Sequence, residues 1–223
     1  MNRKPIGILL IGQTPRADLM ALLHRLAHAC DLLPRGALDA LEAGDLPDAS
    51  GGSYPLVTRL RDGTQVTVDE AFLSPLLQEA IEALEREGVM ALLLLCAGPF
   101  PMLTSTRPLI RPFQLAAGML RSVGRARVGI VVPTDDQRVP SERKWTEAGL
   151  KPVVWSIAEK PAVLSLERWL AARASEHTDL SVLVFDYVGY PLDAVQRVQT
   201  QVGLPVMDLG HLAVAALEAM ILG

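Results

Sequence analysis

The sequence predicts an α/β protein of two pseudo-symmetric half-domains with mainly parallel sheets and a β-hairpin insertion in the first half. Three observations predict this fold class: short apolar runs alternate with helical patterns, two strand motifs recur in order, and a polar stretch interrupts the first half. Parallel strands need crossover connections, which pack helices on both faces of the sheet. Such sheets bind ligands at the carboxyl ends of their strands.

Apolar runs bounded by Gly, Pro or polar residues predict buried strands. These runs are Ile6–Ile11, Ala91–Leu95, Val128–Val132, Leu180–Phe185 and Leu204–Met207. Apolar residues spaced three or four apart predict helices between the strands. The helical patterns are Ala17–Cys30, Leu73–Glu87, Gln114–Ser122, Pro140–Ala148, Val163–Ser175 and His211–Leu222.

A weak internal repeat indicates that the two halves are related. Ile6–Leu10 with Arg16 matches Val128–Val132 with Arg138, at an offset of 122 residues. Ala91–Leu94 with Cys96 and Gly98 matches Val182–Phe185 with Tyr187 and Gly189, at an offset of 91 residues. The repeat predicts a first half-domain over 1–122 plus 207–223, with an insertion at about 34–69, and a second over 123–206.

The insertion contains a predicted hairpin. Val57–Arg61 and Thr64–Val68 flank Asp62-Gly63, a dipeptide that favours the positive φ angles of a two-residue turn. The hairpin could also serve as a surface that docks a partner or a second subunit.

Composition and charge limit the class of partner. Half of the 223 residues are hydrophobic and the net charge is −4, so the basic surface that nucleic acid or an anionic membrane requires is missing. The longest apolar run, Met90–Ala97, is too short to span a bilayer. Two cysteines and no signal-peptide hydrophobic region near Met1 predict a reducing, cytoplasmic compartment. We expect a small-molecule ligand, and homo-oligomerisation stays open.

Cys96 ends a predicted strand and enters a loop in which Gly98 lets the backbone approach a ligand. A thiol there would face the carboxyl edge of the sheet, although a cysteine in an apolar run is also a common core residue. Thr104 and Ser105 follow closely and would hold a carboxylate or, alternatively, cap a helix.

The loop after the first strand brings together Gln13, Thr14 and Arg16 before a helix, a combination that suits an anion. Arg16 would instead pair with Asp18 if the loop had no ligand. The equivalent loop of the second half repeats the hydroxyl as Thr134.

Asp186 and Tyr187 stand at the repeat position equivalent to the Cys96 loop, which predicts that the two loops face each other across a cleft. Asp186 would orient a substrate or act as a base, or it would bond backbone amides as a buried strand-end carboxylate often does. His24 and His28 have a helical spacing that can chelate a metal, but no further ligand pattern completes a site. No nucleotide-binding glycine motif occurs, so we expect neither a metal nor a cofactor.

Five segments resemble the AroM protein family, whose fold is expected to be that of the aspartate/glutamate racemase superfamily. They are Gly12–Asp18, Gly36–Asp39, Tyr54–Gly63, Leu95–Phe100 and Asp186–Tyr190. The resemblance covers nearly the whole chain and implies two α/β halves around a cleft, one catalytic thiol from each half, and no cofactor. Cys96 matches the first thiol, but Tyr187 occupies the second position. A tyrosine is a poor base at neutral pH, so a symmetric two-thiol racemisation is disfavoured.

The resemblance and the strand-end residues together favour a cofactor-independent racemase-like, isomerase-like or lyase-like enzyme acting on a small carboxylate. In this hypothesis Cys96 is the acid/base group or nucleophile, and Asp186 or Tyr187 assists. The carboxylate would be held by Gln13, Thr14, Arg16, Thr104, Ser105 and Thr134, and amides beside Gly98 and Gly189 would stabilise an enolate-like intermediate. The alternative is a non-catalytic protein that binds or senses a small acid.

Overall fold

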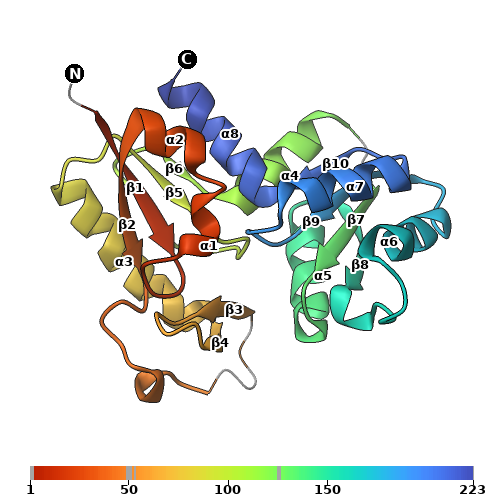
Figure 1. Cartoon of the computed structure of the whole chain (residues 1–223), viewed down its shortest axis with the longest axis horizontal. Helices are drawn as coiled ribbons and strands as arrows, with labels where there is room; N and C mark the ends of the chain where they lie inside the picture. Colours follow the sequence, from red (N-terminus) through yellow and green to blue (C-terminus); the bar gives the residue numbers. More distant parts are fainter. Residues whose placement is uncertain (1–2, 49–51, 53, 125–126, 223) are drawn as a thin grey trace. The chain divides into compact units, whose positions relative to one another are not determined.

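The computed structural model describes residues 3–48, 52, 54–124 and 127–222, which form two α/β units (Figure 1). The first unit spans residues 1–112 with 213–223, and the second spans residues 113–212. The α/β class with mainly parallel sheets is confirmed. The unit boundaries lie at 112/113 and 212/213, whereas the repeat predicts 122/123 and 206/207.

The first unit is built on a four-stranded parallel sheet with the order β2-β1-β5-β6. Its strands are β1 (Lys4–Leu10), β2 (Cys30–Gly36), β5 (Ala91–Leu94) and β6 (Leu109–Ile110). Its helices are α1 (Ala17–Met20), α2 (His24–Ala29), α3 (Glu70–Arg86) and most of α8 (Leu209–Ile221). Helix α8 is tied to this unit by a bond from Lys4 Nζ to the carbonyl oxygen of Ile221 and by the ion pair of Arg25 with Glu218.

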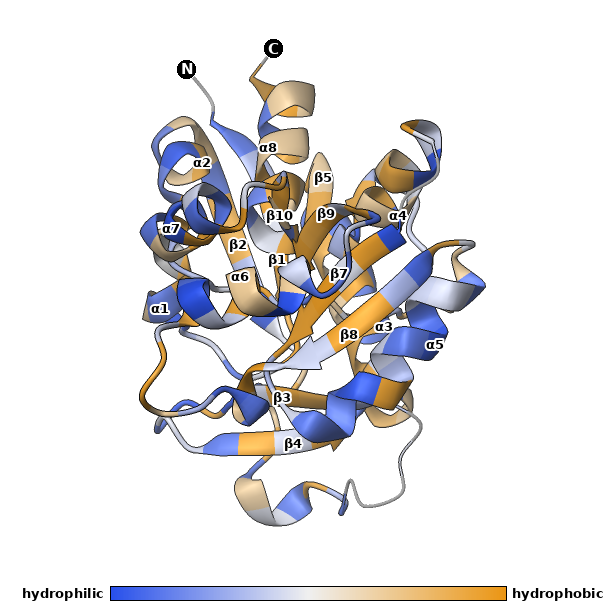
Figure 2. Ribbon diagram, turned by 90° about the vertical axis from the view of Figure 1, so that its right-hand side faces the viewer, coloured by the Kyte–Doolittle hydropathy of each residue, from blue (hydrophilic) through white to orange (hydrophobic). Residues whose placement is uncertain are grey.

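The second unit is built on a parallel sheet with the order β10-β9-β7-β8. Its strands are β7 (Arg127–Val132), β8 (Lys151–Ser156), β9 (Leu180–Phe185) and β10 (Val206–Asp208). Its helices are α4 (Pro112–Ser122), α5 (Arg138–Glu147), α6 (Leu166–Ser175) and α7 (Leu192–Val202), with short 3-10 turns at Asp135–Gln137 and Ile157–Glu159. Figure 2 shows the apolar colouring of the central strands β7 and β9 and the mixed colouring of the edge strand β8.

The two sheets have the same topology when β1, β2, β5 and β6 are equated with β7, β8, β9 and β10. The register agrees as well, because Gly7 pairs with Leu92 in the first sheet and Gly129 pairs with Leu183 in the second. A Cβ atom on either glycine would lie within 3.0 Å of its leucine partner. Each half therefore keeps a residue without a side chain at the same place.

The sequence patterns do not predict three of the strands, β2, β6 and β8, or the helix α7. Strand β2 begins at Cys30, the last residue of the predicted helix, and reaches into the predicted insertion; the predicted helix itself is broken into α1 and α2. Both β2 and β8 are edge strands that contain a proline, which an edge tolerates because one side of its backbone is unpaired. Strand β6 has only two residues, and α7 buries Val195 and Val198 on one face.

The hairpin is confirmed, with β3 (Pro55–Arg59) antiparallel to β4 (Gln65–Asp69), but its turn differs from the prediction. The Gly63 N–H donates to the Leu60 carbonyl oxygen, and the Leu60 N–H donates to that of Thr64. Only Gly63 has a positive φ, +89°, so the loop has three residues with glycine in the left-handed position. Figure 2 shows the alternating hydropathy of β4.

Each unit has its own apolar core. In the first, Leu9, Leu77, Leu92 and Leu94 pack with the hairpin residues Leu56 and Val68. In the second, Val131, Trp155, Leu170, Leu183, Phe185 and Val198 pack together. Because the inner face of the hairpin is part of the first core, the insertion is an integral part of that unit. No helix within the described ranges is long and apolar enough to cross a membrane.

We predict that Gly129→Ala destabilises the protein by about 1–3 kcal/mol, because the added methyl group overpacks a core without space for it. Its Cβ would lie 2.8 Å from the rigid Trp155 ring and 3.0 Å from Leu183. The control is Gly118→Ala in α4, where nothing lies within 4 Å and helix propensity predicts a gain of roughly 0.5–1 kcal/mol. Urea unfolding measures both, and equal stabilities of the two variants would contradict the prediction.

Candidate functional site

The carboxyl ends of the parallel strands carry most of the residues that the sequence singles out. In the first unit, Gln13, Thr14 and Arg16 follow β1, and Cys96 and Gly98 follow β5. In the second unit, Thr134 follows β7, and Asp186, Tyr187 and Gly189 follow β9. Each sheet thus brings its own set to the edge where parallel sheets bind ligands.

The Cys96 thiol lies in a tight, buried loop. Cys96 is 5% exposed, and its Sγ accepts a hydrogen bond from the Gly98 N–H at 3.3 Å. The side chain packs in the same apolar cluster as Leu56 and Phe100. A backbone N–H therefore faces the sulfur, within a largely apolar surrounding.

The loop is held in a strained conformation two residues after Gly98. Phe100 has a φ of +36°, which a bulky residue rarely adopts and which costs on the order of 1–3 kcal/mol. The Arg111 guanidinium donates to the Phe100 carbonyl oxygen at 3.0 Å, and burial lowers the pKa of Arg111. The core therefore enforces the backbone path beside Cys96, and such strain is typical of functional loops.

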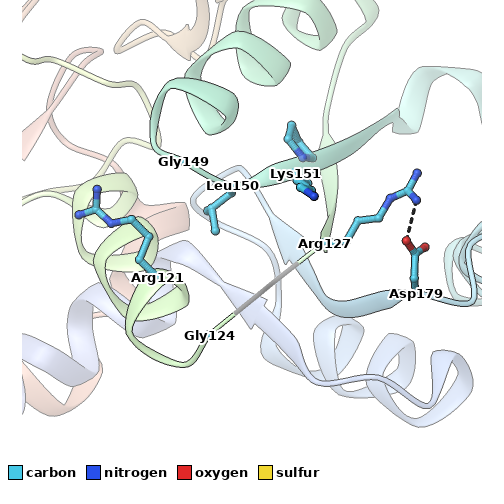
Figure 3. Close-up of a pocket in the computed structure, with 8 residues that line it drawn as sticks. Arg121, Gly124, Arg127, Gly149, Leu150, Lys151 and Asp179 are labelled. Atoms are coloured by element: carbon cyan, nitrogen blue, oxygen red, sulfur yellow. Dashed lines mark hydrogen bonds and ion pairs between the residues drawn. The ribbon is translucent and has the colours of Figure 1, made fainter.

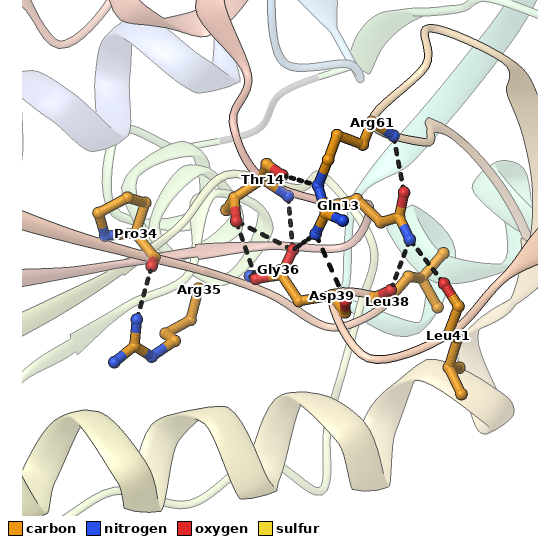
Figure 4. Close-up of polar contacts among 9 residues, drawn as sticks. All are labelled: Gln13, Thr14, Pro34, Arg35, Gly36, Leu38, Asp39, Leu41 and Arg61. Carbon is orange, nitrogen blue, oxygen red and sulfur yellow. Dashed lines mark hydrogen bonds and ion pairs between the residues drawn. The ribbon is translucent and has the colours of Figure 1, made fainter.

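The loop after β1 is locked to the insertion through Gln13 (Figure 4). The Gln13 side-chain amide donates to the carbonyl oxygens of Leu38 and Leu41, and its Oε1 accepts the Arg61 N–H at 2.7 Å. A Cβ on Gly12 would lie 2.4 Å from the Arg59 carbonyl oxygen, so only glycine fits there. Gln13 thus fastens the insertion to the sheet.

Asp39 is the second centre of this contact (Figure 4). Its carboxylate accepts the Thr14 N–H at 2.6 Å, the Thr14 hydroxyl at 2.9 Å and the Gly36 N–H at 2.8 Å. The Arg61 guanidinium lies 3.8 Å from it and donates to the Thr14 carbonyl oxygen. Three of the segments that carry the family resemblance, 12–18, 36–39 and 54–63, therefore meet in one polar network.

Three further residues that the sequence assigns to anion binding have partners within the first unit. Arg16 binds both carboxylate oxygens of Asp18, at 2.8 and 2.6 Å, which lowers the pKa of Asp18. Thr104 bonds Gln78 of α3, and Ser105 donates to Glu85 of α3 at 2.6 Å. The structure thus places Thr104 and Ser105 against helix α3.

Asp186 is the centre of a buried network in the second unit. Its side chain is 1% exposed and accepts hydrogen bonds from Ser141 at 2.6 Å, Lys144 at 2.7 Å and Trp145 at 2.9 Å. Lys144 lies over the Phe113 ring, 4.6 Å from its centroid. The carboxylate therefore fixes helix α5 to the end of β9, which is a structural role.

The remaining strand-end residues of the second unit are Thr134, Tyr187 and Gly189. The Thr134 hydroxyl oxygen is buried and has no hydrogen-bond partner in the described part of the chain. The Tyr187 ring stands edge-on to Tyr190, and burial raises the pKa of Tyr190. Gly189 has a φ of +111°, which favours glycine in this loop.

Asp208 and His211 are site candidates that the sequence patterns miss. Asp208 ends β10, and its Oδ1 lies 2.8 Å from His211 Nδ1. An Asp three residues before a His, at the junction of a short strand and a helix, is the signal that could have identified them.

Metal binding has little support. Within the described residues, no group of three or more His, Cys, Asp or Glu side chains is placed to hold a metal ion. His24 and His28 are exposed on α2, with their Nε2 atoms 3.1 Å apart.

A pocket of about 1250 Å³ lies at the opposite edge of the second sheet, where β7 and β8 begin (Figure 3). It is lined by Arg121, Gly124, Arg127, Gly149, Leu150, Lys151, Pro152 and Asp179. Arg127 is paired with Asp179 at 2.7 Å, and helices α4 and α5 end here, so their partial negative charges oppose an anion. The pocket contains none of the predicted site residues.

A comparison with protein-family profiles assigns the chain to a family. The sequence profile described as AroM protein matches residues 6–222. The chain belongs to the AroM family. A search of the curated proteins finds no match to it.

Solved structures share the fold of this AroM protein at low sequence identity. An aspartate racemase homologue from Pyrococcus horikoshii OT3 is 15% identical, with 99% of this chain and 100% of that chain covered and a TM-score of 0.66. Unliganded arylmalonate decarboxylase is 16% identical over 99% and 93%, with a TM-score of 0.64. Allantoin racemase from Klebsiella pneumoniae is 16% identical over 98% and 88%, with a TM-score of 0.62. The AroM chain therefore has the Asp/Glu racemase-like fold.

We predict that Asp186→Ala destabilises the AroM protein by about 3–5 kcal/mol, because it leaves the buried Lys144 ammonium without its carboxylate. The double variant Asp186→Ala/Lys144→Met should regain much of this loss. Asp193→Ala is the control, since its ion pair with Arg197 is exposed and contributes little to stability. Urea unfolding would contradict the prediction if the Asp186 and Asp193 variants were equally stable.

Proposed function

We propose that this AroM protein is a cofactor-independent enzyme of the racemase, isomerase or lyase kind that acts on a small carboxylate, with Cys96 as its acid/base group. The observation that carries the proposal is the position of Cys96. It follows β5 in a racemase-like fold, in a loop strained at Phe100, with the Gly98 N–H directed at its sulfur.

Two reactions fit a single thiol. In a racemase-like exchange, the thiolate takes the proton from the carbon beside the carboxylate, the C–H electron pair forms an enediolate, and the same carbon is reprotonated. In a lyase-like decarboxylation, the C–C electron pair stays on the carbon as carbon dioxide leaves, the thiol donates its proton to that carbon, and water reprotonates the thiolate. The second route needs only one acid, which suits a chain with Tyr187 at the second thiol position.

The structure narrows the groups proposed to contact the substrate. Gln13 and Thr14 are engaged with the insertion, and Thr104 and Ser105 with α3. The buried Thr134 hydroxyl and the backbone at Gly98 and Gly189 stay as proposed contacts. Asp186 is proposed to act by positioning the Tyr187 loop, because Ser141, Lys144 and Trp145 already hold its carboxylate.

We predict that the wild-type protein exchanges or decarboxylates at least one acid of a panel chosen from its structural relatives: aspartate, glutamate and an arylmalonate. Proton NMR in D2O measures loss of the α-proton signal, and carbon dioxide release measures decarboxylation. Cys96→Ser should lower the rate by about 10²–10⁴-fold, the usual contribution of an acid/base group. Cys30→Ser is the control, because Cys30 is buried at the start of β2.

Full activity of Cys96→Ser on any substrate would overturn the thiol mechanism. The reaction as proposed needs no cofactor, so dialysis against EDTA should leave the rate unchanged.

The 5% exposure of Cys96 favours a second candidate, a non-catalytic protein that binds a small acid. Alkylation by iodoacetamide separates the two. In the enzyme, the Cys30→Ser variant, which keeps Cys96, should react at least about tenfold faster at pH 7 than the Cys96→Ser variant, which keeps Cys30. Burial raises the pKa of Cys30, so that thiol should react slowly. Equal, slow alkylation of both thiols would support the binding protein.

A further inference from the structure

Asp208 stands at a strand end beside the loop that carries Tyr187. It ends β10 and is in register with Phe185, the last residue of the neighbouring strand β9. Its side chain is 2% exposed. Oδ1 accepts the His211 backbone N–H at 2.8 Å and contacts His211 Nδ1 at 2.8 Å, whereas Oδ2 is buried with no partner among the residues described.

Helix capping explains only part of this arrangement. Asp208 precedes α8, and its bond to the His211 N–H is an ordinary N-cap that Ser, Thr or Asn would also provide. The cap requires neither a negative charge nor a contact with the imidazole ring. A buried carboxylate oxygen without a partner is costly, so the charge needs another explanation.

The contact with the ring fixes the state of His211. An ionised carboxylate only accepts hydrogen bonds, so Nδ1 is the donor in this contact and Nε2 is the nitrogen left to gain or lose a proton. The His211 side chain is 31% exposed, which leaves the ring accessible from solvent. This Asp–His arrangement orients an imidazole for proton transfer and stabilises the imidazolium that forms.

The neighbouring phenols are weaker candidates for the same chemistry. Burial and the Asp208 charge raise the pKa of Tyr190, so its hydroxyl stays protonated and cannot serve as a base. Tyr187 contacts Tyr190 edge-on, and a phenol has a reference pKa of about 10. Histidine is the side-chain type that exchanges protons near neutral pH.

We propose that His211 is a proton-transfer residue of this protein and that Asp208 is its positioning residue. The inference rests on the proposed function, because it assigns His211 to a proton of a small carbon acid. In the racemase-like exchange, the Cys96 thiolate takes the proton, the C–H electron pair forms the enediolate, and the His211 imidazolium gives its Nε2 proton to the same carbon. In the opposite direction the Nε2 lone pair takes the proton and the thiol gives one to the carbon, while Asp208 accepts the Nδ1–H bond throughout.

The experiment compares His211→Gln, Asp208→Asn and the control His177→Gln, which replaces the other histidine of the second unit. The readout is the rate of α-proton exchange in D2O on the acid of the panel that the wild type exchanges. His211→Gln should lower kcat by about 10²–10⁴-fold, and Asp208→Asn by at least about tenfold. Asparagine keeps the N-cap, so unfolding by urea should show little loss of stability in Asp208→Asn.

Nitrogen-15 NMR of the imidazoles supplies a readout that a merely structural role would not move. His211 of the wild type should show a protonated Nδ1 and a bare Nε2, and Asp208→Ala, which removes the acceptor, should show a mixture of tautomers. A kcat of His211→Gln within about twofold of the wild type would overturn the proposal, even if Cys96→Ser is inactive. An unchanged tautomer in Asp208→Ala would remove the positioning role.

If the wild type exchanges no acid of the panel, the proposed function is wrong. The Asp208–His211 pair can then still be tested with diethyl pyrocarbonate. This reagent acylates a bare imidazole nitrogen. His211 should be acylated at Nε2 in the wild type, because Asp208 occupies Nδ1, whereas Asp208→Ala should also give the product acylated at Nδ1. The same product in the two proteins would overturn the inference.

Discussion

The close parallel pairing at the centre of each sheet is the constraint on which the rest of the molecule depends. β1 and β5 approach with Gly7 beside Leu92, and β7 and β9 approach with Gly129 beside Leu183. A side chain at either glycine would push the strands apart, because the space is filled by leucine and tryptophan atoms. This pairing sets which residues end each strand, and therefore which side chains reach the edge where chemistry is possible.

Two carboxylates then convert strand-end loops into rigid parts of the fold. The Asp39 carboxylate accepts hydrogen bonds from Thr14 and Gly36 and pairs with the Arg61 guanidinium, and Asp186 accepts hydrogen bonds from Ser141, Lys144 and Trp145. Each is buried or half-buried, so the loss of a donor would leave charge in a poorly solvated place. The family-specific insertion is thereby joined to the sheet by polar contacts as well as by its apolar inner face.

Sequence reasoning succeeds where hydrophobic periodicity and local chemistry agree. The central strands β1, β5, β7 and β9 and the hairpin follow directly from their residues, and the equivalence of Cys96 with Tyr187 follows from the repeat. The edge strand β2 was missed because its proline and polar residues break the apolar pattern. The roles of Gln13, Thr14 and Asp186 cannot be predicted from the sequence either. A polar residue that binds a ligand looks the same in a sequence as one that makes hydrogen bonds within the fold. Their partners, such as Leu38 and Lys144, lie dozens of residues away.

Hydrogen-bond satisfaction separates these two kinds of polar residue. Leaving a buried polar group unpaired costs roughly 1–3 kcal/mol, so a fold rarely retains one without a reason. Gln13 and Asp186 are satisfied by their own units, and their contribution is rigidity. The Thr134 hydroxyl and Asp208 Oδ2 are buried at strand ends and lack partners within the described ranges. The most polar motifs of the sequence therefore stabilise the fold, and the groups best able to bind a ligand are those whose hydrogen-bonding capacity the fold leaves unused.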